Sequence, residues 1–135
     1  MFIIEAHNGS RTWISGILRD EEAAKDYFNS IPEDLRKFQS IISVSKLSYP
    51  FYIVEERKSF RYVNRADVEG LFDRISKLDD EDHVYFNLYF ITQDYRHSEP
   101  GVDYMGILNH IHIDNRFLKN YQRYGIDLLV RNRMA

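Results

Sequence analysis

Three side chains within residues 109–116, NHIHIDNR, have the types and spacing of a metal site. His110, His112 and Asp114 alternate along the chain, and alternate side chains of a strand point to the same face. Imidazole and carboxylate groups that meet on one face can bind a divalent metal ion. The chain contains no cysteine, so thiolate zinc sites and thiol nucleophiles are excluded, and a metal would depend on His and carboxylate ligands.

A structural interpretation of the same residues needs no metal. In this interpretation three isoleucines face the core, namely Ile107, Ile111 and Ile113. His110 and His112 then lie on the wetter side of a strand, and Asp114 caps the following helix. We favour this interpretation, because a capping residue is expected where an apolar strand meets an amphipathic helix. One helix over residues 104–122 also fits the apolar spacing, and it would separate His112 from the face that carries His110 and Asp114.

The HxHxD pattern from His110 to Asp114 resembles the opening of the ligand set in metallo-β-lactamase-like hydrolases. That family continues with a His, whereas this chain has Asn115 and carries no His after His112. The HxH pair also resembles that of the cupins, but the Glu expected three or four residues further on is absent. The glycine motifs of nucleotide-binding sites and the GxSxG nucleophile motif are absent as well. The sequence therefore predicts no cofactor and no resident metal.

The segment QDYRHSEPGVD, residues 93–103, is predicted to be a loop with three reactive groups: His97, Glu99 and Asp103. Together with His110 and His112 these groups could form a metal-dependent or acid/base site, because functional residues are often on loops. A solvated turn around Pro100 and Gly101 is the simpler interpretation. A small enzyme that uses His110 and His112 is therefore kept as the alternative function.

An acidic run leads into a strand that carries tyrosines. The run consists of Asp79, Asp80, Glu81 and Asp82. Tyr85 and Tyr89 alternate with an apolar face and are expected to point outward, and Asp94 follows the strand at its far end. Tyrosine anchors protein contacts, and acidic groups orient the encounter with a basic protein. We therefore predict a partner-binding surface from these seven residues, with a solubilising loop as the simpler alternative.

Hydrophobic periodicity indicates the elements that must position these residues. Seven strands are predicted, over residues 2–7, 12–18, 40–48, 51–56, 58–63, 84–92 and 105–113. The first two are expected to form a hairpin with its turn at Asn8-Gly9, and the last is expected to be a central strand. Helices are predicted to begin after Asp20, Asn64 and Asp114, with Pro32 ending the first and Gly125 ending the last. Helical spacing places Leu78 on the apolar face of the second helix and Tyr124 on that of the last. Short turns between consecutive strands predict an α+β fold with a mainly antiparallel sheet and about three helices packed on it.

The overall composition bounds the class of protein. A length of 135 residues suits one compact domain, so residues 1–135 are expected to form a single globular domain. No stretch has the pattern of a signal peptide or approaches the roughly 20 apolar residues of a membrane span, so we expect a cytoplasmic protein without membrane contact. The net charge of −3 is uneven, because residues 66–103 contain ten acidic and three basic residues. Nucleic acid is not expected as a partner, since binding it depends on Lys and Arg.

These observations favour a non-enzymatic protein that binds a basic protein partner. The most concrete version is a bacterial immunity protein that neutralises a basic toxin, such as a nuclease whose substrate groove is positively charged. A small enzyme is the first alternative. An oligomer-forming structural domain, in which the tyrosine face meets a second copy of the chain, is the second.

Overall fold

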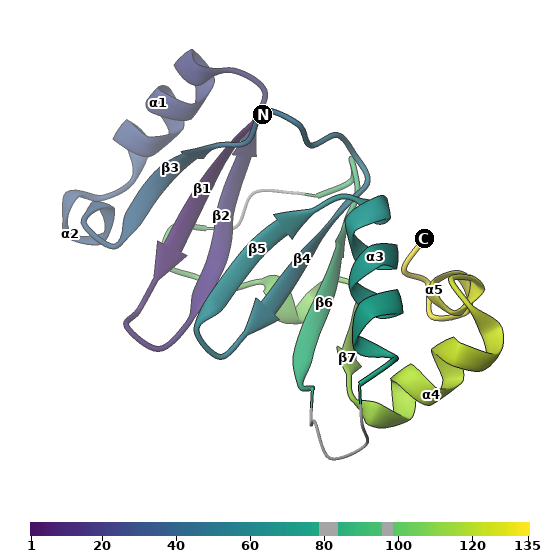
Figure 1. The fold of residues 1–135 in the computed structure, drawn as a ribbon. Coiled ribbons are helices and arrows are strands. Elements are labelled where there is room, and N and C mark those ends of the chain that lie inside the picture. Colours follow the sequence, from purple (N-terminus) through teal and green to yellow (C-terminus); the bar gives the residue numbers. More distant parts are fainter. Residues whose placement is uncertain (79–83, 96–98) are drawn as a thin grey trace. The chain divides into compact units, whose positions relative to one another are not determined.

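The computed structural model describes residues 1–78, 84–95 and 99–135, and the chain divides into two compact units. Unit 1 comprises Met1–Ser48 and Asp94–Ile107, and unit 2 comprises Tyr49–Gln93 and Leu108–Ala135. Each unit contains its own antiparallel sheet, so the predicted α+β class is confirmed, with two sheets in place of one (Figure 1). That the whole chain forms a single globular domain stays a prediction.

Unit 1 contains a three-stranded sheet in the order β2-β1-β3. Its strands are β1 (Phe2–His7), β2 (Thr12–Leu18) and β3 (Gln39–Ser43), and its helices are α1 (Glu21–Ser30) and α2 (Glu33–Arg36). The predicted hairpin between β1 and β2 is confirmed, because Asn8 Oδ1 accepts hydrogen bonds from the backbone of Ser10 and Arg11, and Gly9 has φ 92°. Apolar side chains of β1 and α1 form a buried cluster, so α1 covers one face of this sheet.

The segment Asp94–Ile107 belongs to unit 1 and is fixed to it by specific contacts. The Tyr95 hydroxyl donates to the carbonyl oxygen of Ile14 in β2 at 3.0 Å. Arg11 and Asp103 form an ion pair at 2.9 Å, and Asp103 also accepts from the backbone N–H of Met105. A short 3₁₀ helix, η1 (Met105–Ile107), ends the segment. Asp103 therefore has a structural role at this position.

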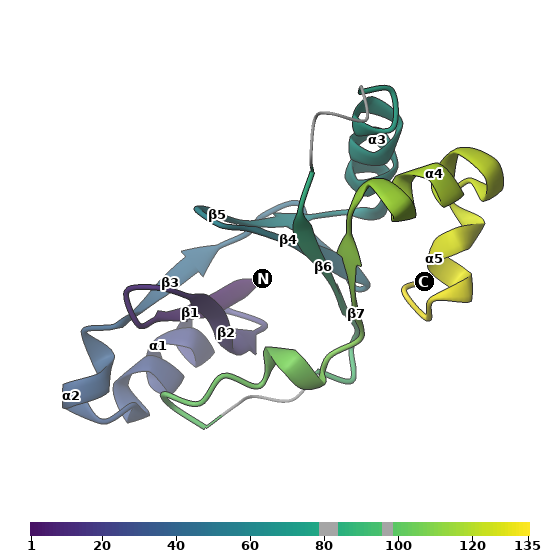
Figure 2. The ribbon, with the colours of Figure 1, turned by 90° about the horizontal axis from the view of Figure 1, so that it is seen from below.

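Unit 2 contains a four-stranded sheet in the order β5-β4-β6-β7, with every neighbouring pair antiparallel. Its strands are β4 (Phe51–Glu56), β5 (Ser59–Val63), β6 (Phe86–Ile91) and β7 (His110–Ile113). Its helices are α3 (Arg65–Ile75), α4 (Asn115–Tyr124) and α5 (Asp127–Arg131). These helices lie on one face of the sheet, where Tyr52, Phe72, Leu88 and Leu129 share a single buried cluster (Figure 2). The opposite face carries the polar residues of the candidate site.

The predicted helix termini are confirmed by hydrogen bonds. Asp20 caps α1 by accepting from Ala23 N at 2.8 Å, and Asp114 caps α4 by accepting from Phe117 N at 2.9 Å. Asn64 forms a reciprocal capping box at the start of α3. Gly125 follows α4 with φ 65°, a backbone conformation that favours glycine. These contacts satisfy amide groups that would otherwise lack a partner in the first turns.

The alternative of one helix over residues 104–122 is not formed, because η1 and β7 precede α4. Other predictions about residues 105–124 are wrong. β7 begins only at His110 and is the last strand in its sheet, not a central one. Ile107 is 81% exposed, since it belongs to η1 and not to the strand whose alternate residues face the core. Tyr124, expected to point inward, is also exposed.

Among the described residues, no helix has the length and apolar character needed to cross a membrane. The longest, α3, contains 11 residues and carries charged side chains. Leu78, expected on the apolar face of this helix, is exposed because the helix ends at Ile75.

Candidate functional site

A row of three polar side chains crosses the sheet of unit 2. Glu55 of β4 pairs with Asn87 of β6, and Asn87 pairs with His112 of β7. Because residues directly opposite one another in antiparallel strands share a face, these side chains lie side by side. The Asn87 amide nitrogen donates to Glu55 Oε1 at 3.2 Å, and Asn87 Oδ1 lies 3.0 Å from His112 Nδ1. We call Glu55, Asn87 and His112 the polar row.

The polar row determines the tautomer of His112. An ionised carboxylate only accepts hydrogen bonds, so the side of the Asn87 amide that faces Glu55 must be the NH₂ group. The amide oxygen then faces His112 and can only accept, so Nδ1 of His112 carries the proton. In the neutral ring, Nε2 therefore presents a lone pair. His112 is exposed, as predicted for the wetter side of the strand.

Tyr89 and His110 form a second pair beside the polar row. They are register partners in β6 and β7, and their ring centroids lie 5.3 Å apart. The Tyr89 hydroxyl donates to Glu55 Oε1 at 3.0 Å. Tyr89 lies on the face of the sheet opposite the helices, as expected, but it is only 3% exposed; its role as a partner anchor stays a prediction. Its ring is packed and its hydroxyl is engaged within the unit, which leaves little surface for a partner.

His110 is fixed in the same tautomer as His112, but by a backbone group. Its Nδ1 lies 2.8 Å from the carbonyl oxygen of Leu108, an atom that can only accept. Nδ1 therefore carries a proton, and in the neutral ring Nε2 presents the lone pair. His110 is exposed, as predicted.

The three-ligand metal site considered for this strand is not formed. Asp114 Oδ1 accepts from the backbone of Phe117, which confirms its predicted role as a helix cap. Among residues 1–78, 84–95 and 99–135, no group of three or more His, Cys, Asp or Glu side chains could hold a metal ion. His97 lies outside the described residues, and Glu99 and Asp103 belong to unit 1.

Tyr85 is the exposed aromatic residue of this region. Its side chain is 59% exposed, and its ring stacks on that of His112 with centroids 6.0 Å apart and an interplanar angle of 15°. Asp79, Asp80, Glu81 and Asp82, which precede it in the predicted binding surface, lie outside the described residues. Asp94 is exposed, but it belongs to unit 1. Of the predicted surface, Tyr85 is thus the exposed residue among the described residues of unit 2.

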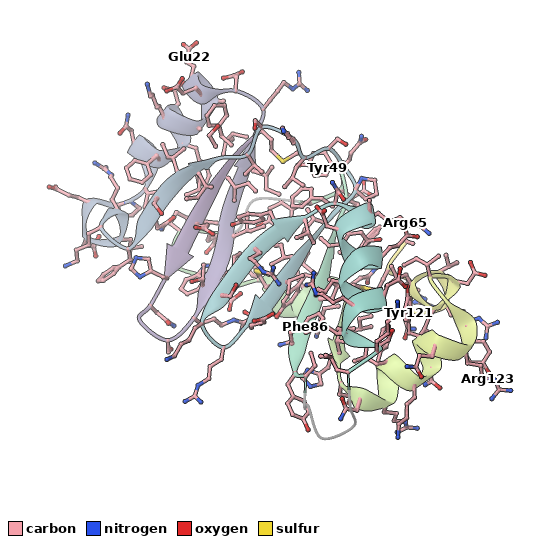
Figure 3. All side chains as sticks on the ribbon, viewed as in Figure 1. Glu22, Tyr49, Arg65, Phe86, Tyr121 and Arg123 are labelled. Atoms are coloured by element: carbon pink, nitrogen blue, oxygen red, sulfur yellow. The ribbon has the colours of Figure 1, made fainter. Side chains whose placement is uncertain are left out.

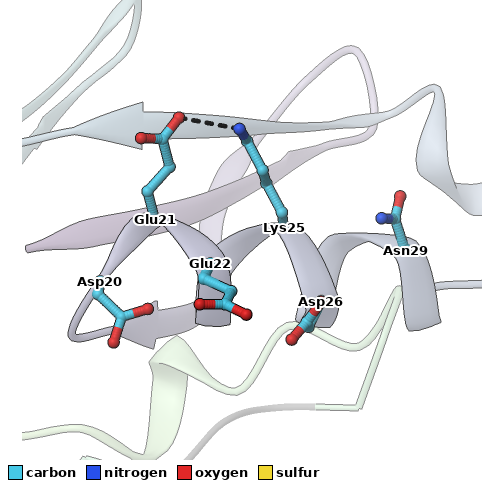
Figure 4. Close-up of a pocket in the computed structure, with 6 residues that line it drawn as sticks. All are labelled: Asp20, Glu21, Glu22, Lys25, Asp26 and Asn29. Carbon is cyan, nitrogen blue, oxygen red and sulfur yellow. Dashed lines mark ion pairs between the residues drawn. The ribbon is translucent and has the colours of Figure 1, made fainter.

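A second acidic surface lies on α1 of unit 1, which the sequence interpretation did not single out. Six residues line a shallow concavity there: Asp20, Glu21, Glu22, Lys25, Asp26 and Asn29 (Figure 4). Glu21 and Lys25 form an ion pair at 3.1 Å, while Glu22 projects away from the helix (Figure 3). Its carboxylates differ in their contacts: Asp20 caps the helix and Glu21 pairs with Lys25, while Glu22 and Asp26 are exposed.

Glu55 and Asn87 were also missed by sequence interpretation, although they orient His112. No local pattern could have paired them, since they are 32 residues apart and Asn87 is 25 residues from His112. No protein-family model, curated protein or solved structure matches this chain. Functional inference therefore depends on the chemistry of its own residues.

Proposed function

We propose that this chain is a non-enzymatic protein that binds a basic protein partner through an acidic surface anchored by Tyr85. The observation that carries the proposal is the combination of exposure and order at Tyr85. Its side chain is 59% exposed, yet its ring is stacked on His112, which is itself bonded to Asn87. A large aromatic side chain held in place before binding is a favourable anchor for a protein contact.

The energetic reason is that ordering a side chain on binding costs free energy. That cost is about 0.5–1.5 kcal/mol for a side chain with many rotamers, and a ring that is already stacked avoids much of it. Tyrosine also offers both an apolar ring and a hydroxyl group, so it tolerates partly hydrated contacts. Tyr85 therefore has the properties of an interface hot spot.

The charge of the neighbouring sequence indicates the class of partner. Asp79, Asp80, Glu81 and Asp82 precede Tyr85 by three to six residues, and Glu55 adds a carboxylate to the polar row. Acidic groups around an aromatic anchor accelerate encounter with a basic protein and disfavour acidic competitors. A basic toxin, such as a nuclease with a positively charged groove, is the partner class that fits this pattern. The chain would then act as its immunity protein.

The experiment starts with capture of partners on the immobilised chain from cells of its source, followed by calorimetric titration with the purified partner. Tyr85→Ala should weaken affinity by about 30-fold, which corresponds to a hot-spot loss of about 2 kcal/mol. Tyr124→Ala is the matched control, because Tyr124 is another exposed tyrosine of unit 2. Equal affinities for wild type and Tyr85→Ala would contradict the proposed anchor.

Neutralising the acidic run tests the electrostatic half of the proposal. The variant with Asp79→Asn, Asp80→Asn, Glu81→Gln and Asp82→Asn should slow association, and the difference should shrink as salt is added. Glu22→Gln with Asp26→Asn on α1 removes acidic charge from the other surface and should leave the association rate nearly unchanged. Light scattering of the free chain distinguishes a foreign partner from a second copy.

The fixed tautomer of His112 favours a second candidate function, that of an acid/base enzyme. A neutral imidazole with Nδ1 protonated presents Nε2 as a base, and a hydrogen-bonded partner on Nδ1 orients it. Loss of hydrolytic activity in His112→Gln, measured on ester and phosphodiester substrates, would support this candidate. Absence of activity in the wild-type chain would leave binding as the favoured function.

A further inference from the structure

We propose that His110 and His112 together bind one divalent transition-metal ion through their two Nε2 atoms. The two residues lie on the same face of β7 and both are exposed. Residues two apart in a strand are separated by about 7 Å, a spacing that two imidazole side chains can bridge by rotating toward a common ion. β7 is the last strand of its sheet, so His110 and His112 lie at an edge of the sheet. The proposed metal site does not require a protein partner, but it shares His112 with the stack on Tyr85.

The hydrogen bonds of both rings already select the tautomer that binds metals. Nδ1 of His110 donates to the Leu108 carbonyl oxygen at 2.8 Å, and Nδ1 of His112 donates to Asn87 Oδ1 at 3.0 Å. Histidines that bind metals almost always donate their second ring nitrogen to a carbonyl or carboxylate group in this way. Both Nε2 atoms are consequently lone-pair donors in the neutral rings.

The electrostatics of the surrounding side chains favour a cation. The polar row ends at the carboxylate of Glu55, which also accepts from Tyr89. Its negative charge is transmitted through the Asn87 amide toward His112, as in the carboxylate and amide contacts that support metal-binding histidines. A cation bound to His112 would therefore be favoured by the Glu55 carboxylate through this chain of hydrogen bonds.

The ligand chemistry determines which ions fit. Imidazole nitrogen prefers Cu²⁺, Ni²⁺ and Zn²⁺ over Mg²⁺ and Ca²⁺, which prefer oxygen. With two protein ligands, the remaining coordination positions would be filled by water or by a donor from another molecule. The site would then be an exchangeable surface site, unlike a closed structural site with four protein ligands.

Binding requires a defined movement of the two rings. His112 stacks on Tyr85, while the ring of His110 is tilted against Tyr89 at 31°. To place both Nε2 atoms at about 2.0–2.1 Å from one ion, the rings must turn toward each other and away from these tyrosines. Zinc binding should consequently change tyrosine fluorescence. The variant Tyr85→Phe should still bind the ion, because phenylalanine retains the aromatic ring beside His112 and the tyrosine hydroxyl is not a proposed ligand.

The test is calorimetric titration of the untagged full chain at neutral pH with ZnCl₂ and NiCl₂, with MgCl₂ as the hard-ion control. We expect one Zn²⁺ or Ni²⁺ per chain and no Mg²⁺ binding. His110→Gln and His112→Gln should each weaken binding by at least about tenfold, because each removes one arm of a chelate. Asn87→Leu should weaken binding by about tenfold, since it frees the supporting nitrogen of His112.

His7→Gln is the matched control, because His7 is exposed in unit 1 and outside the pair. It should bind Zn²⁺ like wild type. Thermal unfolding without metal checks that each variant is folded, and both His110 and His112 are exposed, so their replacement should leave the melting temperature nearly unchanged. No binding by the wild-type chain, two independent ions, or wild-type affinity in either single variant of the pair would overturn the shared site.

Discussion

The acidic face of α1 and the polar row of unit 2 both gather polar side chains, but they hold them in different ways. On α1, Glu22 and Asp26 are exposed carboxylates that lie one helical turn apart. In the polar row, Glu55 accepts from two neighbouring side chains, and Asn87 connects it to His112. The first arrangement supplies charge alone. The second fixes orientation and proton position, which is what a specific contact requires.

The strongest test of this comparison is Glu55→Ala. The Tyr89 hydroxyl and the Asn87 amide lose their shared acceptor, and Tyr89 is nearly fully buried. We expect the free energy of unfolding to fall by about 2 kcal/mol, the usual cost of removing the partner of a buried polar group. Urea unfolding measures this change.

Glu22→Ala on α1 is the matched control for Glu55→Ala. Because Glu22 is exposed, its replacement should change the free energy of unfolding by less than about 0.5 kcal/mol. Equal losses in the two variants would mean that the polar row is no better ordered than the helix surface, and the contrast between the two regions would disappear.

A buried polar side chain of unit 1 extends the comparison. Gln39 is 7% exposed, and among the described residues its Oε1 has no hydrogen-bond partner. It lies across β1 from Trp13, with Ala6 between them in the register. Gln39→Leu keeps a similar size and removes the buried amide, so we expect the free energy of unfolding to rise by about 1 kcal/mol.

Urea unfolding of Gln39→Leu beside wild type gives this value. Asn87→Leu makes the same kind of change in the polar row, where both ends of the amide are bonded, and should destabilise the chain. Changes of the same sign in the two variants would contradict the expected difference between Gln39, a buried amide with an unbonded oxygen, and Asn87, a partly buried amide with both ends bonded.

Local signals predicted most of the elements and helix ends. Asn8-Gly9 predicted the first hairpin, while Asp20, Asn64 and Asp114 predicted the three long helices. In each case the cause is contained in a few neighbouring residues, so the sequence pattern and the structure agree. The acidic residues before Tyr85 could be found in the same way, as a run of charge.

The polar row could not be predicted, because its cause is the register between distant strands. Glu55, Asn87 and His112 meet only when β4, β6 and β7 pair in one particular alignment. Alternation in β6 correctly separated two faces, but it could not reveal that Tyr89 would be buried on the polar one. Likewise, short turns predicted antiparallel pairing without revealing that the strands divide into two sheets.

The buried hydroxyl of Tyr121 should make the stability of the chain depend on pH. Its hydroxyl donates to Asp73 Oδ1 at 2.6 Å, and burial together with this bond raises the pKa of Tyr121 to about 12. Below pH 10, both folded and unfolded chains keep the phenol proton. Between pH 10 and about 12, the unfolded chain releases it while the folded chain retains it, so stability should fall as pH rises through this range.

Tyr121→Phe isolates this effect from the other tyrosines. The stability advantage of wild type over Tyr121→Phe should shrink between pH 10 and 12, as measured by urea unfolding at a series of pH values. Wild type and Tyr121→Phe share every other tyrosine, so the titration of those tyrosines cancels in the difference. A constant difference between wild type and Tyr121→Phe across this range would argue against a raised pKa.

The smallest expected effect concerns the charge on α1. Glu22 and Asp26 are four residues apart, so their like charges oppose helix formation by a few tenths of a kcal/mol. Asp26→Lys replaces this repulsion with a favourable pair and should raise the free energy of unfolding by about 0.5 kcal/mol at low salt. The gain should largely vanish at 1 M salt, where charges on an exposed helix are screened. A gain in the free energy of unfolding that persists at 1 M salt would show that the side chain at position 26 makes ordered contacts. The surface of α1 would then resemble the polar row of unit 2 in this respect.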